Sequence, residues 1–268
     1  MVRIGVAGAE GRMGSRIVAL LKEYDGLQLA GAFERAGHKD IGKDIGVLCG
    51  TGESGIKLSG SISEIINGVD IIIDFTSIES TKENLRAVAA KKGKAMVIGT
   101  TGFTRADMKE IGPLLKNIPC VMASNMSLGV NLLLKVLQDI ARTLGDDYDI
   151  EIVEAHHRLK KDAPSGTAMK MAQVISDAVG RNLDEVAVYE RKGLTGARTQ
   201  KEIGIQTIRA GDIVGEHTVI FGGLGERIEV THKASSRDTF ARGALKAALW
   251  LAERQAGLYD MQDVLGLR

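Results

Sequence analysis

The chain begins with the stretch that decides its fold, Val2-Arg-Ile-Gly-Val-Ala-Gly-Ala-Glu-Gly-Arg-Met-Gly14. Its first six residues make a short run of mainly apolar residues, which predicts a buried strand, and the glycines after it predict a tight turn. Apolar residues then recur with helical spacing at Met13, Ile17, Leu20 and Leu21. A strand, a glycine-rich turn and a helix in this order are typical of the start of a dinucleotide-binding domain.

The glycine turn departs from a strict G-x-G-x-x-G pattern, because Ala9 stands where the first glycine would be. The physical requirements survive this change. Gly11 lets the backbone approach a pyrophosphate, Gly14 lets the helix pack closely on the sheet, and the helix N-terminus offers N–H donors. Taken alone, such a loop could equally be a plain tight turn, so its context has to support the interpretation.

Glu34 provides that context, since it ends the second predicted strand twenty residues after Gly14. An acidic side chain there can accept hydrogen bonds from the adenosine ribose hydroxyls. Arg35 follows it, and a guanidinium can pair with the 2′-phosphate that a carboxylate alone would repel. The pair therefore predicts that both NADH and NADPH are used, although it could also be the end of a surface strand. Glu10 would weaken pyrophosphate binding unless its carboxylate points to solvent.

Further continuous apolar runs alternate with amphipathic helical stretches up to about residue 127, at 27–33, 69–76, 95–102 and 119–123. Such alternation indicates α/β architecture: a doubly wound, Rossmann-type parallel sheet covered on both faces. Two strand ends, Gly99-Thr-Thr101 and Ala123-Ser-Asn-Met126, put small residues and backbone amides where such a sheet presents a cofactor. Each would be unremarkable as a turn.

The pattern changes after residue 127. We expect a long helix over Leu128–Leu144, a strand over Tyr148–Ala155 and a helix after Thr167. Three strand-like runs follow with short connections and predict an antiparallel meander; they lie at 203–209, 213–221 and 227–234. A last helix, Asp238–Glu253, is expected to return to the first domain. The predicted domains are thus 1–127 for dinucleotide binding, completed by 237–268, and 128–236, an α+β substrate-binding and oligomerisation domain with an open mixed sheet.

The composition gives no sign of a nucleic-acid or membrane partner. The 268 residues carry a formal net charge of +1, and no apolar run approaches the roughly 18 residues that span a bilayer. The only two cysteines, Cys49 and Cys120, are far apart, which fits reduced thiols better than a disulfide framework. We therefore expect a cytoplasmic protein.

The run from Glu154 to Ala168, EAHHRLKKDAPSGTA, crowds two histidines, an arginine and two lysines into six residues at the end of an apolar strand. Such a cluster of charged and titratable side chains does not stabilise a fold, but it can bind a small, doubly anionic substrate and transfer a proton to it. Gly166 and Thr167 open the next helix, whose amides can bind a carboxylate. The alternative is a solvated basic loop, which describes most charge runs of this kind.

Together these segments resemble the dihydrodipicolinate reductase (4-hydroxy-tetrahydrodipicolinate reductase) family over essentially the whole chain. The supporting motifs are Gly8–Gly14, Asp74-Phe-Thr76, Gly99–Gly102, Ser127–Asn131 and, most specifically, Glu154–Ala168. The resemblance implies reduction of 4-hydroxy-tetrahydrodipicolinate, a small dicarboxylate heterocycle, to tetrahydrodipicolinate in lysine and diaminopimelate biosynthesis. It also implies NADH or NADPH as cofactor, and a homotetramer built through the open sheet of the second domain.

Carried over residue by residue, the resemblance makes His156 the proton donor/acceptor and Lys160 the proton donor. His157 becomes a substrate contact, and Gly166 with Thr167 binds a substrate carboxylate. The implied cofactor-binding residues are Gly8, Ala9, Glu10, Gly11, Arg12, Met13, Glu34, Arg35, Gly99, Thr100, Thr101, Ala123, Ser124, Asn125 and Met126. Three positions depart from the commonest family pattern, namely Leu159, where a histidine is frequent, Met126, where phenylalanine is frequent, and Glu10, where a small neutral residue is frequent.

Two rival functions remain open at this stage. Another two-domain dehydrogenase, such as one acting on an amino-acid semialdehyde, would explain the glycine loop but not the basic run. A catalytically idle NAD(P)-sensing regulator would bind the cofactor without turnover. No metal is expected, because the histidines lack metal-ligand spacing. Ser165 lacks a nucleophile elbow, and His38, His217 and His232 receive no role.

Overall fold

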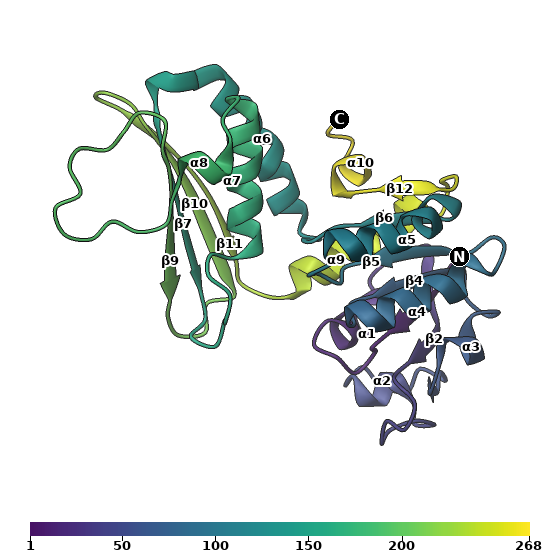
Figure 1. Ribbon diagram of the computed structural model, residues 1–268. Helices are drawn as coiled ribbons and strands as arrows, with labels where there is room; N and C mark the ends of the chain where they lie inside the picture. The colour runs from purple at the N-terminus through teal and green to yellow at the C-terminus, as the bar shows by residue number, and fades with distance from the viewer. The chain divides into compact units, whose positions relative to one another are not determined.

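The computed structural model describes residues 1–268, which form two compact units. The N-terminal unit comprises Met1–Leu128 together with Arg237–Arg268, and the central unit comprises Gly129–Ser236. Figure 1 shows the chain leaving the first unit after β6 and returning to it at α9. None of the helices combines the length and the apolar character needed to cross a membrane.

The N-terminal unit is built on a seven-stranded sheet with the strand order β12-β6-β5-β4-β1-β2-β3. Every strand pairs with its neighbours in parallel. The strands are β1 Val2–Ala7, β2 Leu27–Phe33, β3 Leu58–Ser59, β4 Ile71–Asp74, β5 Ala95–Ile98, β6 Pro119–Met122 and β12 Gly257–Tyr259. Because all run the same way, their carboxyl ends, with the segments that sequence analysis selected, lie along one edge of the sheet.

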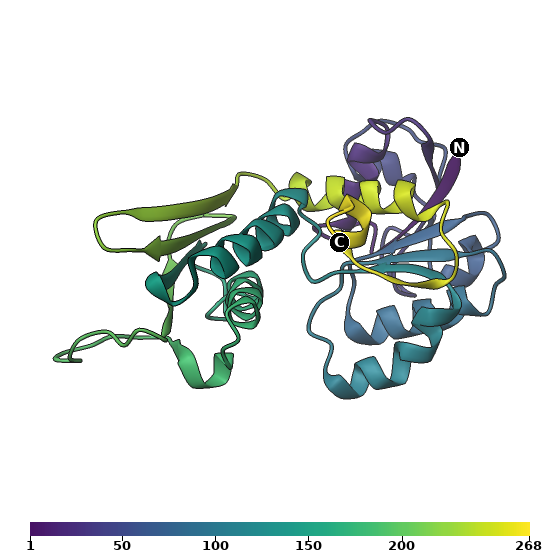
Figure 2. The same cartoon turned by 90° about the horizontal axis from the view of Figure 1, so that it is seen from above.

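Helices cover both faces of this sheet, as Figure 2 shows from above. One face carries α1 (Gly14–Leu21), α2 (Ile45–Leu48), α9 (Asp238–Leu251) and α10 (Met261–Leu265). The other face carries α3 (Ile62–Ile65), α4 (Ile78–Ala89) and α5 (Arg105–Asn117). Successive residues of β4 point to opposite faces, so that Ile71 and Ile73 join the first core and Ile72 joins the second. The predicted doubly wound architecture is confirmed.

Helix α9 is the element through which the chain returns to the first sheet. Its buried stripe is made largely of alanines, which lets the helix lie close to α1 and to the strands. Gly243 marks the closest approach, because a Cβ there would lie 1.7 Å from the carbonyl oxygen of Met126. A glycine is therefore needed where α9 crosses the segment after β6.

The central unit is a five-stranded mixed sheet in the order β11-β10-β7-β9-β8. Its strands are β7 Asp149–His156, β8 Ala187–Val188, β9 Ile203–Arg209, β10 Gly215–Gly222 and β11 Arg227–Ala234. The helices α6 Leu128–Leu144, α7 Gly166–Ala178 and α8 Leu183–Val186 share one core with the sheet, which leaves its other face open (Figure 1). The short helix η1 (Gly145–Asp147) connects α6 to β7. The expected α+β unit with an open mixed sheet is confirmed.

The predicted antiparallel meander is wrong in one respect. Strands β10 and β11 do form an antiparallel hairpin, but β9 pairs in parallel with β7 and not with β10. Strand β7 lies between β9 and β10, antiparallel to the latter. The five residues 210–214 that join β9 to β10 can reach over one strand, since that span is only about 10 Å. A short connection therefore did not require the two strands to be neighbours.

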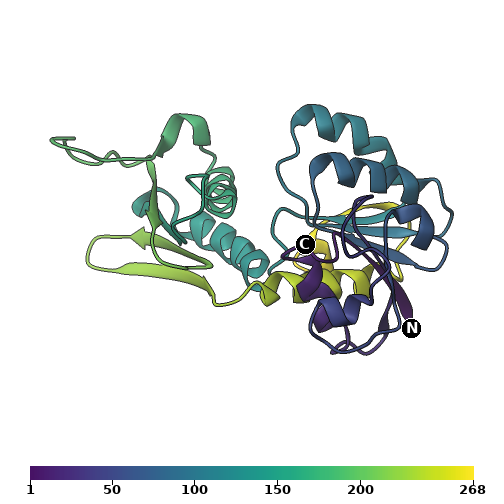
Figure 3. The same ribbon diagram turned by 90° about the horizontal axis from the view of Figure 1, so that it is seen from below.

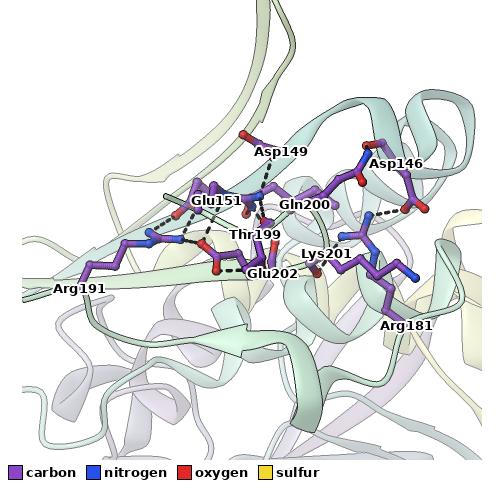
Figure 4. A network of polar contacts seen from close by, with 11 residues as sticks. Asp146, Asp149, Glu151, Arg181, Arg191, Thr199, Gln200, Lys201 and Glu202 are labelled. Atoms are coloured by element: carbon purple, nitrogen blue, oxygen red, sulfur yellow. Dashed lines mark hydrogen bonds and ion pairs between the residues drawn. The ribbon is translucent and has the colours of Figure 1, made fainter. Parts of the chain in front are cut away.

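An ion-pair network fastens the long connection between β8 and β9 to β7, the central strand of this sheet (Figure 4). Arg191 donates to both oxygens of Glu151, at 3.0 and 2.7 Å, and to Glu202 at 2.8 Å. Arg198 reaches Glu151 and Asp149 at 3.0 and 2.7 Å. The tip of this connection extends away from the sheet, as Figure 3 shows from below. The network therefore fixes the base of a projecting loop.

Candidate active site

The glycine loop of the N-terminal unit is a tight turn between β1 and α1 that leaves no room for a side chain at its glycine positions. Gly8 has a φ of 61°, and its amide donates to the carbonyl of Phe33 on β2 at 3.0 Å. A Cβ on Gly14 would lie 2.1 Å from the Gly8 carbonyl oxygen, and one on Gly11 would lie 3.0 Å from it. The glycines therefore let the loop close tightly on itself at the N-terminus of α1, where backbone N–H groups can bind an anion such as a pyrophosphate.

Glu34 lies directly beside this loop, because its Oε1 accepts the backbone N–H of Glu10 at 3.1 Å. One carboxylate oxygen therefore braces the glycine turn, and Oε2 remains for ribose hydroxyls. Arg35 is exposed next to it. The Glu10 carboxylate does not simply point to solvent, because it lies 3.2 Å from Nδ1 of His38.

Glu10 and His38 also approach Asp40, and the three could offer ligands to a cation. The Asp40 carboxylate is already neutralised, since the Lys43 ammonium lies 2.6 Å from it and that of Lys39 lies 3.8 Å away. These two ammonium groups oppose metal binding, so we assign no metal to the cluster.

A cleft of about 270 Å³ opens beside the glycine loop within the N-terminal unit. It is lined by Arg12, Met13, Phe75, Gly99, Ser124, Asn125, Met126, Arg237 and Phe240. Six of these are predicted cofactor residues, so the structure brings together the glycine loop and the ends of β5 and β6. Phe75 packs so closely on Gly99 that a Cβ there would lie 2.1 Å from its ring. Sequence analysis assigned no cofactor contact to Phe75, Arg237 or Phe240, although Phe75 lies in the quoted motif Asp74-Phe-Thr76.

The buried Asp74 carboxylate holds the ends of β4 and β5 in place behind this cleft. It accepts hydrogen bonds from the Thr76 amide, the Thr81 hydroxyl and the Asn84 side chain at 2.9, 3.1 and 2.8 Å, and from the Thr100 hydroxyl at 3.3 Å. A fully buried carboxylate is stable only with partners of this kind. The predicted Thr100 is thereby oriented by Asp74, while Thr101 next to it is exposed.

The basic run of the central unit starts where β7 ends, around a second buried carboxylate. Glu154 has no exposed surface, and its two oxygens face Arg209 at 2.8 Å each, the ring of His156 at 2.6 Å and the amide of Ser165 at 2.9 Å. Burial opposes the charged form, but these hydrogen bonds outweigh it and lower the pKa of the Glu154 carboxyl below its ordinary value. Glu154 is therefore an anion that orients its neighbours.

His156 is the residue that this carboxylate orients. Its Nδ1 faces Glu154, whereas Nε2 makes no hydrogen bond within the protein. Burial lowers the pKa of the imidazole, and the nearby carboxylate opposes that shift without cancelling it. The ring is therefore neutral at neutral pH, with its proton on Nδ1 and an acceptor lone pair on Nε2.

Lys160 lies in the loop after β7 and is mostly shielded from solvent. Its ammonium pairs with Asp162 at 2.9 Å, and its charge is close enough to His156 to contribute to the lowered pKa of that ring. The departure at Leu159 puts an apolar side chain, 79% exposed, next to it. His157 is half-buried, and its Nδ1 is buried without a hydrogen-bond partner in the protein.

The N-terminus of α7 completes the group in the central unit. The helix starts at Gly166, and Ser165 caps it by accepting the Ala168 amide at 3.2 Å. Gly166 is exposed and Thr167 is half-buried at this end. Because Ser165 also donates its amide to Glu154, the same carboxylate positions His156 and the first turn of α7. An anion can therefore be bound at this helix end, next to the imidazole of His156.

His217 of β10 belongs to this group, although sequence analysis assigned it no role. It is buried, its Nε2 lies 3.0 Å from the Ser165 hydroxyl, and its ring meets that of His156 edge-on with centroids 5.2 Å apart. Arg209 was also missed. In the strand register His217 lies opposite Glu154, and Arg209 lies opposite His156. Cross-strand neighbours cannot be found without the strand order, but the Glu154-x-His156 spacing did signal one shared face.

Acidification should destabilise the protein through His217. Burial, with the neighbouring His156 charge, lowers the pKa of His217 from 6.5 to about 4. Between these pH values His217 is therefore protonated in the unfolded chain but neutral in the folded chain. Stability present above pH 6.5 is lost as the pH falls toward 4, on the order of 2–3 kcal/mol. Urea unfolding at several pH values should show the advantage of the wild type over His217→Gln shrinking in this window; a constant difference would contradict the prediction.

Comparisons with known proteins agree over the whole length of the chain. The family model for the N-terminus of dihydrodipicolinate reductase matches residues 2–126, and the model for the C-terminus matches residues 129–265. Proteins from Syntrophobacter fumaroxidans and Syntrophus aciditrophicus, both named 4-hydroxy-tetrahydrodipicolinate reductase, are each 56% identical over 100% of both chains.

Solved structures give the same result at the level of the fold. A dipicolinate-bound dihydrodipicolinate reductase from Paenisporosarcina sp. TG-14 superposes with a TM-score of 0.74 at 25% identity and covers 98% of each chain. An amine dehydrogenase from Mycobacterium smegmatis shares the fold alone, with a TM-score of 0.59 at 15% identity over 96% of this chain and 94% of its own. The resemblance seen in the sequence is confirmed: the chain belongs to the dihydrodipicolinate reductase family.

Proposed function

We propose that this protein is a 4-hydroxy-tetrahydrodipicolinate reductase that works in lysine and diaminopimelate biosynthesis. The reaction consumes the hydroxylated ring, NADH or NADPH and a proton, and yields tetrahydrodipicolinate, the oxidised cofactor and water. One observation carries the proposal beyond family membership. A buried carboxylate orients His156 and the first turn of α7 together, so a proton-transfer group lies beside an anion-binding helix end.

The N-terminal unit fits a nicotinamide dinucleotide. Gly11 and Gly14 let the loop close tightly on the Gly8 carbonyl, which a Cβ at either position would meet, and the N-terminus of α1 supplies N–H donors for a pyrophosphate. The free oxygen of Glu34 suits the adenosine ribose, and the cleft beside Met126 suits the nicotinamide end. When bound, the cofactor supplies the hydride that the ring accepts.

The central unit binds the dicarboxylate in this proposal. Gly166 and Thr167 at the start of α7 hold one carboxylate through backbone N–H groups and a hydroxyl. The enclosed Nδ1 of His157 is a hydrogen-bonding group without a partner in the protein, consistent with a substrate contact. The Paenisporosarcina enzyme binds dipicolinate, an aromatic ring of the same dicarboxylate type.

Lys160 and His156 carry out the proton transfer in this proposal. The Lys160 ammonium donates to the ring carbon next to the one that receives the hydride. His156, neutral and with Nε2 bare, accepts or returns a proton, and Glu154 stabilises the imidazolium that forms. The ion pair between Lys160 and Asp162 keeps the ammonium near this histidine before the substrate arrives.

Arg35 should set the use of NADPH in particular. Its guanidinium is exposed beside Glu34 and can pair with a 2′-phosphate, which is a charge-assisted contact. We expect Arg35→Ala to raise KM for NADPH about 10-fold and to leave KM for NADH within about twofold. Steady-state kinetics with both cofactors measures this, with Lys22→Ala, an exposed cation at the end of α1, as the matched control. Equal losses for both cofactors would remove the 2′-phosphate role.

We also propose a cytoplasmic homotetramer that assembles through the open face of the central sheet. Support for the tetramer comes from the family, and from a sheet covered by helices on one face only. Sedimentation or light scattering of the purified protein measures the assembly directly.

The function is tested by following NADPH absorbance with freshly generated 4-hydroxy-tetrahydrodipicolinate. We expect NADPH oxidation that depends on this substrate and ceases when it is consumed. Oxidation only with an amino-acid semialdehyde would favour another dehydrogenase. Cofactor binding with no turnover on any such substrate would favour a regulator.

A further inference from the structure

The guanidinium of Arg209, the last residue of β9, donates four hydrogen bonds within the protein. Its Nη1 and Nη2 donate to the two oxygens of Glu154 at 2.8 Å each, which is a bidentate ion pair. Nη2 also donates to the backbone carbonyl of Asp162 at 2.6 Å, and Nη1 donates to that of Ile208 at 2.7 Å. One guanidinium therefore holds a buried carboxylate and the loop after β7 at the same time.

The two groups that Arg209 holds lead to the two predicted proton-transfer residues. Through Glu154 it reaches Nδ1 of His156, 2.6 Å from the carboxylate. Through the backbone of Asp162 it reaches the residue whose side chain pairs with Lys160 at 2.9 Å. Neither Arg209 nor Glu154 is assigned a contact with substrate or cofactor, and Glu154 has no exposed surface with which to make one.

We propose that Arg209 and Glu154 are positioning residues of the reductase reaction. The inference rests on the proposed function and deepens it. The pair holds the His156 ring in one orientation and one tautomer, and it fixes the loop that presents Lys160. The proton-transfer residues are thereby held in place before the substrate binds, which saves the cost of ordering them during the reaction.

The tautomer follows from the contacts. A neutral imidazole carries one N–H, and a carboxylate 2.6 Å from Nδ1 selects the form with the proton on that nitrogen. Nε2 is then an acceptor. Gly215 leaves space beside it, because a Cβ at that position would lie 3.1 Å from Nε2. Without Glu154 both tautomers become available, and only one presents a bare Nε2 to the substrate.

A purely structural brace would have the same ion pair without the histidine, and the sheet contains such a pair. Arg191 holds Glu151 of the same strand with two hydrogen bonds, at 3.0 and 2.7 Å (Figure 4), and its other side-chain partner is Glu202. Arg191→Met is therefore the matched control for Arg209→Met. Both remove one arginine from a bidentate pair with β7, but only Arg209 is coupled to His156.

The test measures the His156 tautomer by ¹⁵N NMR at neutral pH, in the wild type, Glu154→Gln, Arg209→Met, Arg209→Lys and Arg191→Met. We expect the Nδ1–H form in the wild type and in Arg191→Met, and a mixture of tautomers in Glu154→Gln and Arg209→Met. Arg209→Lys should lie in between, because a lysine keeps the charge but not the bidentate geometry. An Nε2–H form in the wild type, or an unchanged tautomer in folded Glu154→Gln, would overturn the proposal.

Kinetics on the same variants completes the test. Glu154→Gln should lower kcat by up to roughly 10⁴-fold, the loss seen when a histidine-orienting carboxylate is replaced by its amide, and leave KM for NADPH within about twofold. An unchanged kcat with a mixed tautomer would also overturn the role. A wild type that oxidises no NADPH would refute the proposed function instead, and the NMR result would still show whether the pair sets the tautomer. If Glu154→Gln or Arg209→Met does not fold, the tautomers measured in the wild type and in Arg209→Lys test the proposal.

Discussion

Lys160→Gln is expected to lower kcat by roughly 10²–10⁴-fold, the usual contribution of a positioned acid. The glutamine amide occupies similar space but has no proton to donate to the ring carbon. The residues proposed to bind NADPH belong to the other unit, so the dissociation constant for NADPH should stay within about twofold. Steady-state turnover and fluorescence titration of the cofactor measure the two quantities separately.

Lys161→Gln is the matched control for this variant. It makes the same chemical change one residue along the chain, at an exposed side chain that the mechanism does not use. We expect its kcat to stay within about twofold of the wild type. Equal losses in both variants would mean that the basic run acts only by attracting an anion, and an unchanged kcat in Lys160→Gln would remove that residue from the mechanism.

His156→Gln is expected to lower kcat by a similar factor, roughly 10²–10⁴-fold, and to change the pH profile. Burial lowers the pKa of His156 below 6.5, despite the opposing effect of Glu154, so the neutral ring predominates at neutral pH. As the pH falls below 6.5 and the imidazole takes up a proton, Nε2 stops being an acceptor and kcat/KM should decline. The profile of the residual activity in the variant should lack that acidic decline.

His232→Gln serves as the control, since it changes a half-buried histidine of the same sheet, on β11, to which no role is assigned. Its pH profile should keep the acidic decline of the wild type. A decline that persists unchanged in His156→Gln would assign the titration to another group and contradict the role of this histidine.

The sequence predicted the long elements well, because each has enough residues to show a period. The bounds of β2, β9, β11 and α6 agree with the expected ranges, and the continuous apolar runs correctly indicated a parallel sheet with both faces covered. The four-residue strands β4, β5 and β6 were found because each lies in a longer apolar run, but the short elements β3, α2 and α10 were missed. They contain too few residues for a hydrophobic period to appear.

The site was predicted only as far as local sequence reaches. The histidines, the lysine and the helix start lie within one run of fifteen residues, and their common location followed from that run. Arg209 and His217 join Glu154 from strands more than fifty residues later, through a register that depends on the order of the strands. The meander prediction put β9 beside β10, which hid the parallel contact of Arg209 with β7.

The central claim is that a nicotinamide cofactor held by the N-terminal unit delivers hydride to a ring held by the central unit. The most direct test uses NADPH carrying deuterium at the transferable position of the nicotinamide, with mass spectrometry of the tetrahydrodipicolinate formed. We expect one deuterium per product molecule, carbon-bound and retained in ordinary water. Product without deuterium, or labelled cofactor that is never consumed with the substrate present, would contradict the claim.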